Sequence, residues 1–257
     1  MAESHRNEPV EHVKDAARQK AKAGVTSRPK REWRTYLFEL GLVAAIGAFT
    51  TLAVLAKTTP SFPVDVQITR ALQSLSSPSF TVLMNLISWP GFSPQTYLIP
   101  AVIVLILYLL GFQWEAVAAA FATLLPPVVN VIVKQIIQRP RPTMDLVDVF
   151  RILDSYSFPS GHVMFYVGFF GFMWFLVYTL LKRSPLRTSL LVLLGIFIAL
   201  VGVSRIYLGQ HWASDVLGAY LLGSLTLVTN IWFYRWGKKR FFVRQPTAPE
   251  ESSPSDH

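Results

Sequence analysis

Three short polar segments stand in an otherwise apolar chain and hold the side chains best suited to chemistry. They are Lys134 with Arg141-Pro142, then Pro159-Ser160-Gly161-His162, then Ser204-Arg205 with His211 and Asp215. A charged side chain at the centre of a membrane helix costs roughly 2.5–3.5 kcal/mol on insertion scales, so charges kept at membrane depth indicate function. This set of side chains is suited to holding a phosphate, attacking it with an imidazole and protonating the group that leaves.

His211 and Asp215 are four residues apart at the expected start of an apolar run. On a helix, this spacing places both side chains on one face, one turn apart. A carboxylate in that position accepts a hydrogen bond from one ring nitrogen, fixes the tautomer and leaves the other nitrogen nucleophilic. A capped helix start with an interfacial His–Asp pair explains the same two residues, and both interpretations stay open at this point.

His162 follows Ser160, which suits a helix N-cap, and Gly161, which permits a close approach of the backbone. A helix N-terminus after such a turn presents free N–H groups to an anion. There a protonated His162 could donate its proton to a leaving oxygen. The alternative is a loop-to-helix corner that carries an interfacial histidine.

Lys134, Arg141 and Arg205 suit the dispersed negative charge of a phosphoryl-transfer transition state, in which positioning and electrostatics dominate. Pro140 and Pro142 end the preceding helix, and the long Lys134 side chain can extend toward the same layer. Taken singly, each cation is equally explained as a basic flank that anchors a helix to lipid headgroups.

The elements that must position these residues are membrane helices. The 257 residues are 52% hydrophobic and 15% charged with a mean hydropathy of +0.39, which is too apolar for an ordinary soluble domain. A span needs about 20 apolar residues. We therefore predict an all-α, polytopic membrane bundle with six transmembrane helices at roughly 36–56, 95–112, 115–137, 163–181, 188–204 and 213–234.

Between the first two spans, residues 57–94 contain no run long enough to cross a membrane. Apolar residues recur there at helical spacing, which predicts two short helices lying in the interface. Their apolar positions are Val64, Ile68, Leu72 and Leu75, then Phe80, Leu83, Met84 and Ile87. We expect three regions, namely a disordered basic cytoplasmic arm (1–34), a six-span domain (35–242) and a disordered cytoplasmic tail (243–257).

The net charge of +9 is distributed beside the expected spans, so anionic lipid headgroups are the expected partner and nucleic acid is not. Among the Lys and Arg residues near the expected spans, helix parity places twelve on the side of the termini and seven on the other. The positive-inside rule then makes both termini cytoplasmic, and the three polar segments face the extracytoplasmic side. Because the chain has no cysteine, disulfides and thiol ligands are excluded.

In this order and at this spacing, the three segments resemble the signatures of the type 2 phosphatidic acid phosphatase family. Its members are also called lipid phosphate phosphatases, and they share a superfamily with vanadium haloperoxidases and bacterial acid phosphatases. The defining positions are Lys, six residues, Arg-Pro; Pro-Ser-Gly-His; and Ser-Arg, five residues, His, three residues, Asp, and this chain matches all of them. The resemblance covers about residues 60–235.

The resemblance implies a role for each matching residue. His211 would be the nucleophile that forms a phosphohistidine, Asp215 would orient it, and His162 would protonate the leaving group. The phosphate oxygens would be bound by Lys134, Arg141 and Arg205, with Ser160 and Gly161. It implies no metal and no cofactor. The expected substrate is a lipid phosphate or diphosphate such as phosphatidate, phosphatidylglycerophosphate or undecaprenyl diphosphate, and the expected location is the plasma membrane.

Three other functions fit parts of the pattern. A lipid phosphotransferase would use the same site with a hydroxyl acceptor in place of water. A non-catalytic lipid-binding or transport protein would be expected to lack one of the reacting groups, which this chain retains. A haloperoxidase using vanadate fits the anion site but does not fit six membrane spans. The sequence does not identify the lipid, the oligomeric state or the bilayer.

Overall fold

The computed structural model of the chain describes the backbone of residues 8–242 and the side chains of residues 33–242. No β-strand occurs within 8–242, and the expected all-α class is confirmed. The helical elements are α1 (Glu8–Thr58), α2 (Pro63–Gln73), α3 (Pro78–Ser88), η1 (Trp89–Gly91), α4 (Gln95–Leu109), α5 (Gln113–Ile137), α6 (Gly161–Phe165), η2 (Tyr166–Phe170), α7 (Gly171–Leu180), α8 (Pro185–Tyr207), α9 (Ala213–Gly237) and η3 (Lys238–Phe242).

Within the described part of the chain, five helical stretches are long and apolar enough to cross a membrane. They are Trp33–Thr58, Gln113–Ile137, Gly161–Leu180, Pro185–Tyr207 and Ala213–Phe242. A sixth span is formed if Pro78–Gly91 and Gln95–Leu109 cross together, since the pair passes the same test with a bend of 57°. Pro90 and Pro94 interrupt the helix at this bend. Five of the six expected spans are therefore present on their own, and the expected second span at 95–112 passes only together with α3, which we expected to lie in the interface.

The chain divides into two units, residues 1–47 and 48–257. In the first unit, most of the described apolar side chains of α1 are exposed, as at Trp33, Leu37 and Leu40. The helix begins at Glu8, inside the segment that we expected to be a disordered arm. No side chain before residue 33 is described, and the tail at 243–257 lies outside the described residues. The boundaries and the disorder expected for both terminal regions stay predictions.

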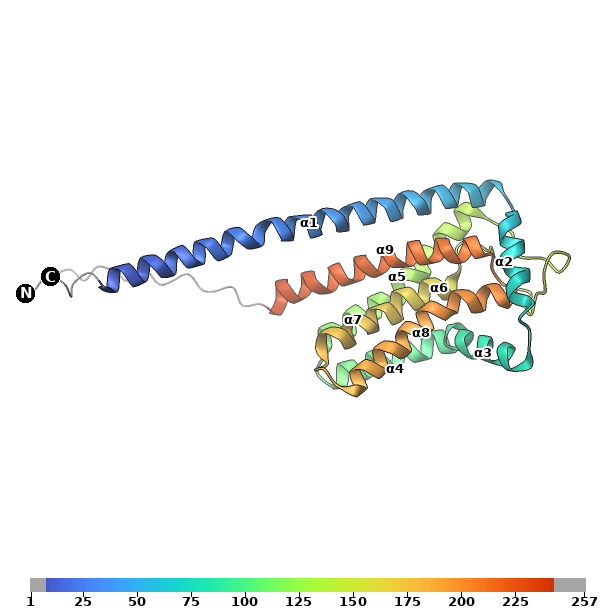
Figure 1. The fold of residues 1–257 in the computed structure, drawn as a ribbon. Helices are drawn as coiled ribbons and strands as arrows, with labels where there is room; N and C mark the ends of the chain where they lie inside the picture. The colour runs from blue at the N-terminus through green and yellow to red at the C-terminus, as the bar shows by residue number, and fades with distance from the viewer. Residues whose placement is uncertain (1–7, 243–257) are drawn as a thin grey trace, which may run out of the picture. The chain divides into compact units, whose positions relative to one another are not determined.

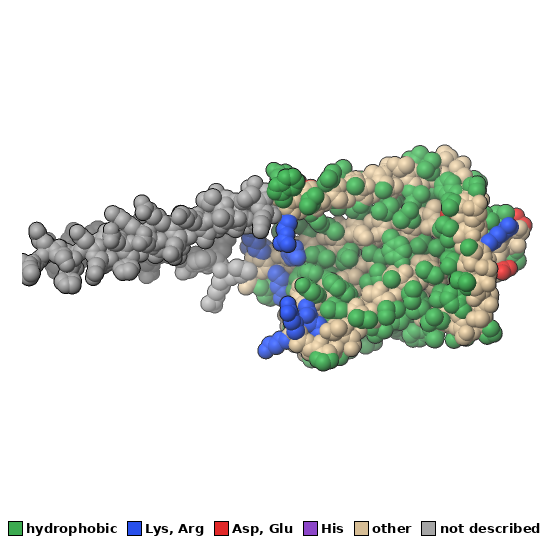
Figure 2. Space-filling model, in the orientation of Figure 1, with side chains coloured by type: hydrophobic (Ala, Val, Ile, Leu, Met, Phe, Trp, Pro, Cys, Tyr) green, Lys and Arg blue, Asp and Glu red, His purple; other side chains and the backbone are tan. Residues whose placement is uncertain are grey.

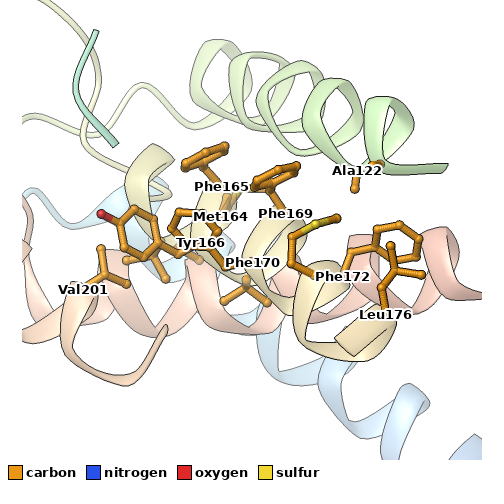
Figure 3. Close-up of a cluster of buried hydrophobic side chains, with 14 of the residues drawn as sticks. Ala122, Met164, Phe165, Tyr166, Phe169, Phe170, Phe172, Leu176 and Val201 are labelled. Atoms are coloured by element: carbon orange, nitrogen blue, oxygen red, sulfur yellow. The ribbon is translucent and has the colours of Figure 1, made fainter. Parts of the chain in front are cut away.

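In the second unit, α5, the span of α6, η2 and α7, and α9 pack side by side (Figure 1). Their core is a run of buried aromatic side chains on that span, joined by Met164, Leu176 and Val201 (Figure 3). The neighbouring face of α5 is built from small residues such as Ala118 and Ala122. At Gly168 a Cβ atom would lie 2.4 Å from Cγ of Pro126, so this position needs glycine for α5 to approach.

Local capping sets where three of the helices begin or end. Ser184 opens α8 by accepting a hydrogen bond from the backbone N–H of Arg187 at 3.2 Å. The carboxylate of Asp215 opens α9 by accepting from the backbone N–H of Trp212 at 2.9 Å. Helix α5 ends at Gln138, whose φ of 57° is left-handed, and Pro140 follows. The loop 138–160 therefore starts at the end of α5.

Successive spans run in opposite directions, so the connections between them lie alternately at the two ends of the bundle. The loop 138–160 and helix α2 lie at one end (Figure 1), where Arg70 donates to the carbonyl of Leu146 at 2.9 Å. The 181–184 connection and the end of α9 lie at the other. Hydrophobic side chains cover the flanks of the bundle, and Lys and Arg gather at that second end (Figure 2). Exposed cations there are Lys182, Arg183, Arg235, Lys239 and Arg240.

Candidate active site

The three polar segments meet at the end of the bundle where α5 ends and where α6 and α9 begin. The backbone N–H of Ser160 donates to the carbonyl of Asp215 at 3.3 Å, which joins the second segment to the third. One terminal nitrogen of Arg141, NH1, donates to the carbonyl of Gln210 at 2.6 Å, which joins the first segment to the third. Side chains that are far apart in the sequence therefore form one site.

The His211 side chain is 3% exposed, and its two ring nitrogens face different groups. Nε2 lies 3.2 Å from Arg141 NH1, whereas Nδ1 lies 3.7 Å from Oδ2 of Asp215 and 3.5 Å from Oγ of Ser157. A separation of 3.7 Å is too long for a hydrogen bond. The expected direct bond from the ring to Asp215 is therefore absent, because His211 lies in the turn before α9 and not on the helix itself.

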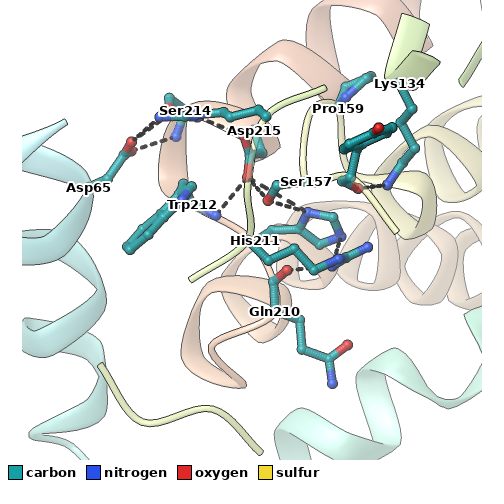
Figure 4. Close-up of polar contacts among 12 residues, drawn as sticks. Asp65, Lys134, Ser157, Pro159, Gln210, His211, Trp212, Ser214 and Asp215 are labelled. Carbon is teal, nitrogen blue, oxygen red and sulfur yellow. Dashed lines mark hydrogen bonds and ion pairs between the residues drawn. The ribbon is translucent and has the colours of Figure 1, made fainter. Parts of the chain in front are cut away.

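Ser157 occupies the position between these two residues (Figure 4). Its hydroxyl donates to Oδ2 of Asp215, and the same oxygen atom faces Nδ1 of His211. Ser157 is fully buried, and its backbone N–H is held by the carbonyl of Arg139 at 2.8 Å. The sequence reasoning missed this serine because it belongs to none of the three signatures.

The surroundings of His211 favour the neutral imidazole. Burial holds its pKa well below the usual 6.5, and the positive charges of Arg141, Lys134 and Arg205 act in the same direction. Burial also lowers the pKa of Arg141, although an arginine stays protonated at neutral pH. His211 therefore keeps a lone pair on a ring nitrogen at pH 7, as a nucleophile must.

Arg141 and Lys134 are held by neutral oxygen atoms of the loop 138–160. Arg141 donates through Nε to the carbonyl of Ser155 at 2.7 Å and through NH2 to its hydroxyl at 2.8 Å. The ammonium group of Lys134 donates to the carbonyl of Tyr156. Neither cation forms an ion pair with a residue of the described part. Their positive charges are therefore available to an anionic ligand.

Arg205 is fully buried at the end of α8 and leaves part of its guanidinium without a partner. Its NH1 donates to the hydroxyl of Ser88 at 3.2 Å, and its Cζ lies 5.4 Å from the centre of the Phe92 ring. Nε and NH2 are buried and have no hydrogen-bond partner among the described residues. Leaving such donors unpaired costs about 1–3 kcal/mol each, more when charged, so their arrangement favours an oxyanion ligand.

His162 lies in the first turn of α6, against the segment that joins α3 to α4. Its ring meets Phe92 edge-on with centres 5.0 Å apart, and a Cβ atom on Gly91 would lie 2.3 Å from its Cδ2. Nε2 of His162 is buried and has no partner within residues 33–242. This nitrogen can therefore serve a bound ligand.

Ser160 immediately precedes α6, as expected for an N-cap, but its side chain makes no capping bond. Its hydroxyl is buried without a partner in the described part of the chain. The turn is supported from α5 by Asn130, which donates to the carbonyl of Pro159 at 2.9 Å. A Cβ atom on Gly161 would lie 3.3 Å from the Asn130 side-chain oxygen. Asn130, which belongs to none of the three signatures, thus supports the second one from α5.

Behind Asp215 lies an ion-pair network that the sequence did not reveal (Figure 4). Arg139 donates to Oδ1 of Asp215 at 2.6 Å and to Oδ2 of Asp65 at 2.9 Å. Asp65 in turn accepts from the backbone N–H of Ser214 at 2.9 Å and from its hydroxyl at 2.7 Å. The only sign of this network in the sequence is that two arginines, Arg139 and Arg141, flank one proline.

A family model described as PAP2 superfamily matches residues 115–242. Phosphatidylglycerophosphatase B of Bacillus subtilis (strain 168) is 29% identical over 180 residues, which cover 69% of this chain and 86% of that protein. Undecaprenyl-diphosphatase of Sulfolobus acidocaldarius is 42% identical over 71 residues, which cover 27% of this chain and 30% of that protein.

Two solved structures are similar. The crystal structure of a transmembrane PAP2 type phosphatidylglycerolphosphate phosphatase from Bacillus subtilis has a TM-score of 0.67 and 26% identity, covering 76% of this chain and 96% of that one. Aquifex aeolicus LpxE has a TM-score of 0.53 and 20% identity, covering 66% of this chain and 96% of that one. The second likeness concerns the fold alone.

Proposed function

We propose that this chain, whose residues 115–242 match the PAP2 superfamily, is an integral-membrane phosphatase that hydrolyses the phosphate or diphosphate of a lipid through a phosphohistidine. One observation carries the proposal. His211, His162 and three cations without carboxylate partners gather at one end of a membrane bundle, and several of their buried donors have no partner in the described part. A tetrahedral phosphate supplies the negative oxygens that these groups lack.

In the proposed first step, Nε2 of His211 attacks the phosphorus atom. The bond from phosphorus to the lipid oxygen breaks, and the leaving oxygen takes a proton from His162. Lys134, Arg141 and Arg205 hold the equatorial oxygens, with help from the hydroxyl of Ser160 and the N–H of Gly161. The electrostatic role falls to these cations because phosphoryl transfer depends mainly on positioning and charge stabilisation.

In the proposed second step, His162 removes a proton from water, and the resulting hydroxide attacks the phosphohistidine. The bond from Nε2 to phosphorus breaks, its electron pair returns to His211, and inorganic phosphate leaves. Asp215 faces Nδ1, directly and through Ser157, and stabilises the positive imidazole while phosphorus is attached. The cycle returns both histidines to their starting protonation states.

A cavity beside α5 supports a lipid substrate. A cavity of about 580 Å³ borders Lys134 and is lined by α5 and the loop 138–160. Its lining residues are Val131, Lys134, Gln135, Asp154, Ser155 and Tyr156. An acyl or isoprenyl chain could lie against the apolar flank of α5 while its headgroup reaches the cations.

We further propose that the protein lies in the plasma membrane. The distribution of Lys and Arg supports an extracytoplasmic site and cytoplasmic termini.

The proposal is tested with the purified full chain in detergent, with EDTA present. Phosphate release is measured from phosphatidate, phosphatidylglycerophosphate and undecaprenyl diphosphate. We expect release from at least one of them, and a loss of about 10³-fold or more in His211→Ala, because removal of a nucleophile abolishes the covalent path. Asp145→Asn, which changes an exposed loop residue, is the matched control.

Two results would contradict this function. One is no release from any of the three lipids; the other is a His211→Ala loss of less than tenfold. A label from the donor lipid that is recovered in another lipid, and not as inorganic phosphate, would assign the same site to a phosphotransferase.

A further inference from the structure

The buried ion pairs behind Asp215 involve two residues to which the proposed mechanism gives no role. Arg139 is 1% exposed and Asp65 is 1% exposed, and Arg139 bridges Asp65 to Asp215. The guanidinium also donates through NH1 to the hydroxyl of Ser214 at 2.7 Å and through Nε to the carbonyl of Pro60 at 3.1 Å. Its orientation is therefore fixed from several sides.

The arrangement leaves the two oxygens of Asp215 with different tasks. Oδ1 accepts the strong bond from Arg139 at 2.6 Å. Oδ2 accepts from Ser157 and from the backbone N–H of Trp212, and it is the oxygen nearest His211. A partial rotation of the carboxylate would break the pair with Arg139, so the pair holds the carboxylate in the orientation that directs its other oxygen toward the imidazole.

Helix α2 supplies the outer part of this network. Asp65 lies on its buried face and also accepts from the backbone N–H of Phe62 at 3.3 Å, which caps the helix. Val64 and Ile68 on the same helix are 54% and 39% exposed, as expected for an interfacial helix. The helix is thus tied to the start of α9 through Asp65 and Ser214.

We propose that Asp65 and Arg139 are positioning residues that fix the orientation of Asp215 and set the charge behind His211. This inference rests on the proposed function, because Asp215 influences the reaction only if His211 is the nucleophile. Asp65, Arg139 and Asp215 together carry a net charge of −1. Without the Asp65 charge the sum is zero, and the positive imidazole of a phosphohistidine loses support.

A structural ion pair would predict a different outcome. If Arg139 and Asp65 only hold α2 against the bundle, their loss would lower stability and leave the protonation of His211 unchanged. A positioning role changes that protonation. Charged or titratable groups face His211 from each neighbouring element, namely Lys134 on α5, Arg141 in the loop 138–160, His162 on α6, Arg205 on α8 and Asp215 on α9.

The experiment compares two variants of the full chain in detergent with matched controls. Asp65→Asn keeps the side-chain shape and removes the charge, whereas Arg139→Lys keeps the charge and loses the fork that reaches both carboxylates. Asp145→Asn and Arg183→Lys make the same chemical changes at exposed positions without a recorded polar contact. Phosphate release from whichever of the three lipids is hydrolysed fastest gives kcat and KM from pH 5 to 9, and NMR of ¹³C-labelled histidine gives the titration of His211.

For Asp65→Asn we expect kcat to fall about 10- to 100-fold with KM changed less than about threefold, the size typical of groups that orient a histidine. The His211 titration should move to lower pH by about half a unit or more, because a negative charge has been removed. Arg139→Lys should lower kcat by a similar factor. Both controls should match the unsubstituted chain.

The inference is overturned if the His211 titration of Asp65→Asn equals that of the unsubstituted chain, whatever happens to kcat. It is also overturned if kcat of Asp65→Asn stays within twofold of Asp145→Asn. Because the NMR titration needs no turnover, it decides the inference even if none of the three lipids is hydrolysed. The absence of hydrolysis, or a His211→Ala variant that retains activity, would contradict the proposed function. Neither result would overturn the positioning role, so the two failures are distinguishable.

Discussion

At the scale of single residues, the cations at this site divide into two kinds. Arg139 is paired with two carboxylates, whereas Lys134, Arg141 and Arg205 are paired with none among the described residues. The paired arginine is part of the protein's own charge balance, and the other three retain charge for an anionic ligand. Arg139 and Arg141 stand two residues apart in an Arg-Pro-Arg-Pro run, so the sequence alone does not distinguish their roles.

The lowered pKa of His211 predicts the pH dependence of the reaction. Because its value lies well below 6.5, the free imidazole is neutral at pH 7 and is protonated only as the pH falls through that lowered value. Arg141→Gln removes a positive charge beside Nε2 and raises the His211 pKa. The acid limb of kcat/KM should therefore move to higher pH, and kcat/KM at pH 7.5 should fall about 10²-fold with the loss of a phosphate ligand.

The measurement is a pH profile of kcat/KM for the same lipid with both enzymes, so that ionisation of the substrate contributes equally. Arg183→Gln, at the opposite end of the bundle, is the control and should leave the profile unchanged. An acid limb that stays in place or moves to lower pH in Arg141→Gln would contradict the electrostatic account of His211.

At the scale of elements, the segment from α3 to α4 forms a wall of the site although no signature covers it. The hydroxyl of Ser88 contacts both Ser204, at 2.6 Å, and Arg205. The ring of Phe92 contacts both Arg205 and His162. The bend at Pro90 and Pro94 therefore places polar and aromatic groups where the leaving group would lie. Residues of this segment are candidates for choosing the lipid.

Gly91→Ala tests this wall. The new Cβ atom would lie 2.3 Å from Cδ2 of His162, so the ring must shift and donate its proton less effectively. We expect kcat for a lipid phosphate to fall about 10- to 100-fold, within the range that general acid catalysis contributes. With 4-nitrophenyl phosphate, whose leaving group needs little protonation, the loss should be smaller.

The matched control is Gly195→Ala in α8, where a Cβ atom meets nothing within 4 Å. This variant should keep full activity on both substrates. Equal losses on the lipid and on the nitrophenyl ester in Gly91→Ala would show that the displaced ring does not act as the acid.

At the scale of the whole molecule, the sequence was sufficient to predict the helices and the convergence of the three signatures at one end of the bundle. Apolar length predicts spans, and the alternating direction of spans brings the end of α5, the starts of α6 and α9 and the end of α8 to one side. The sequence was not sufficient to predict the contacts that depend on packing between segments far apart in the chain. The carboxylate of Asp65 is 74 residues from Arg139, and no periodicity relates the two. Ser157 likewise acquires its position only when the loop 138–160 folds over α9.

The orientation of the whole bundle can be tested directly because the natural chain has no cysteine. A single cysteine can be introduced at Asp145, which is exposed in the loop 138–160, or at Arg183, which is exposed in the connection at the other end. The twelve cations near the spans on the side of the termini predict that Arg183 is cytoplasmic and that Asp145 is extracytoplasmic. In intact cells, a membrane-impermeant maleimide should therefore label Asp145→Cys and leave Arg183→Cys unlabelled until the membrane is permeabilised. The reverse pattern would place the site on the cytoplasmic side. It would also mean that the cations of the site, and not those on the side of the termini, had set the orientation of the chain in the membrane.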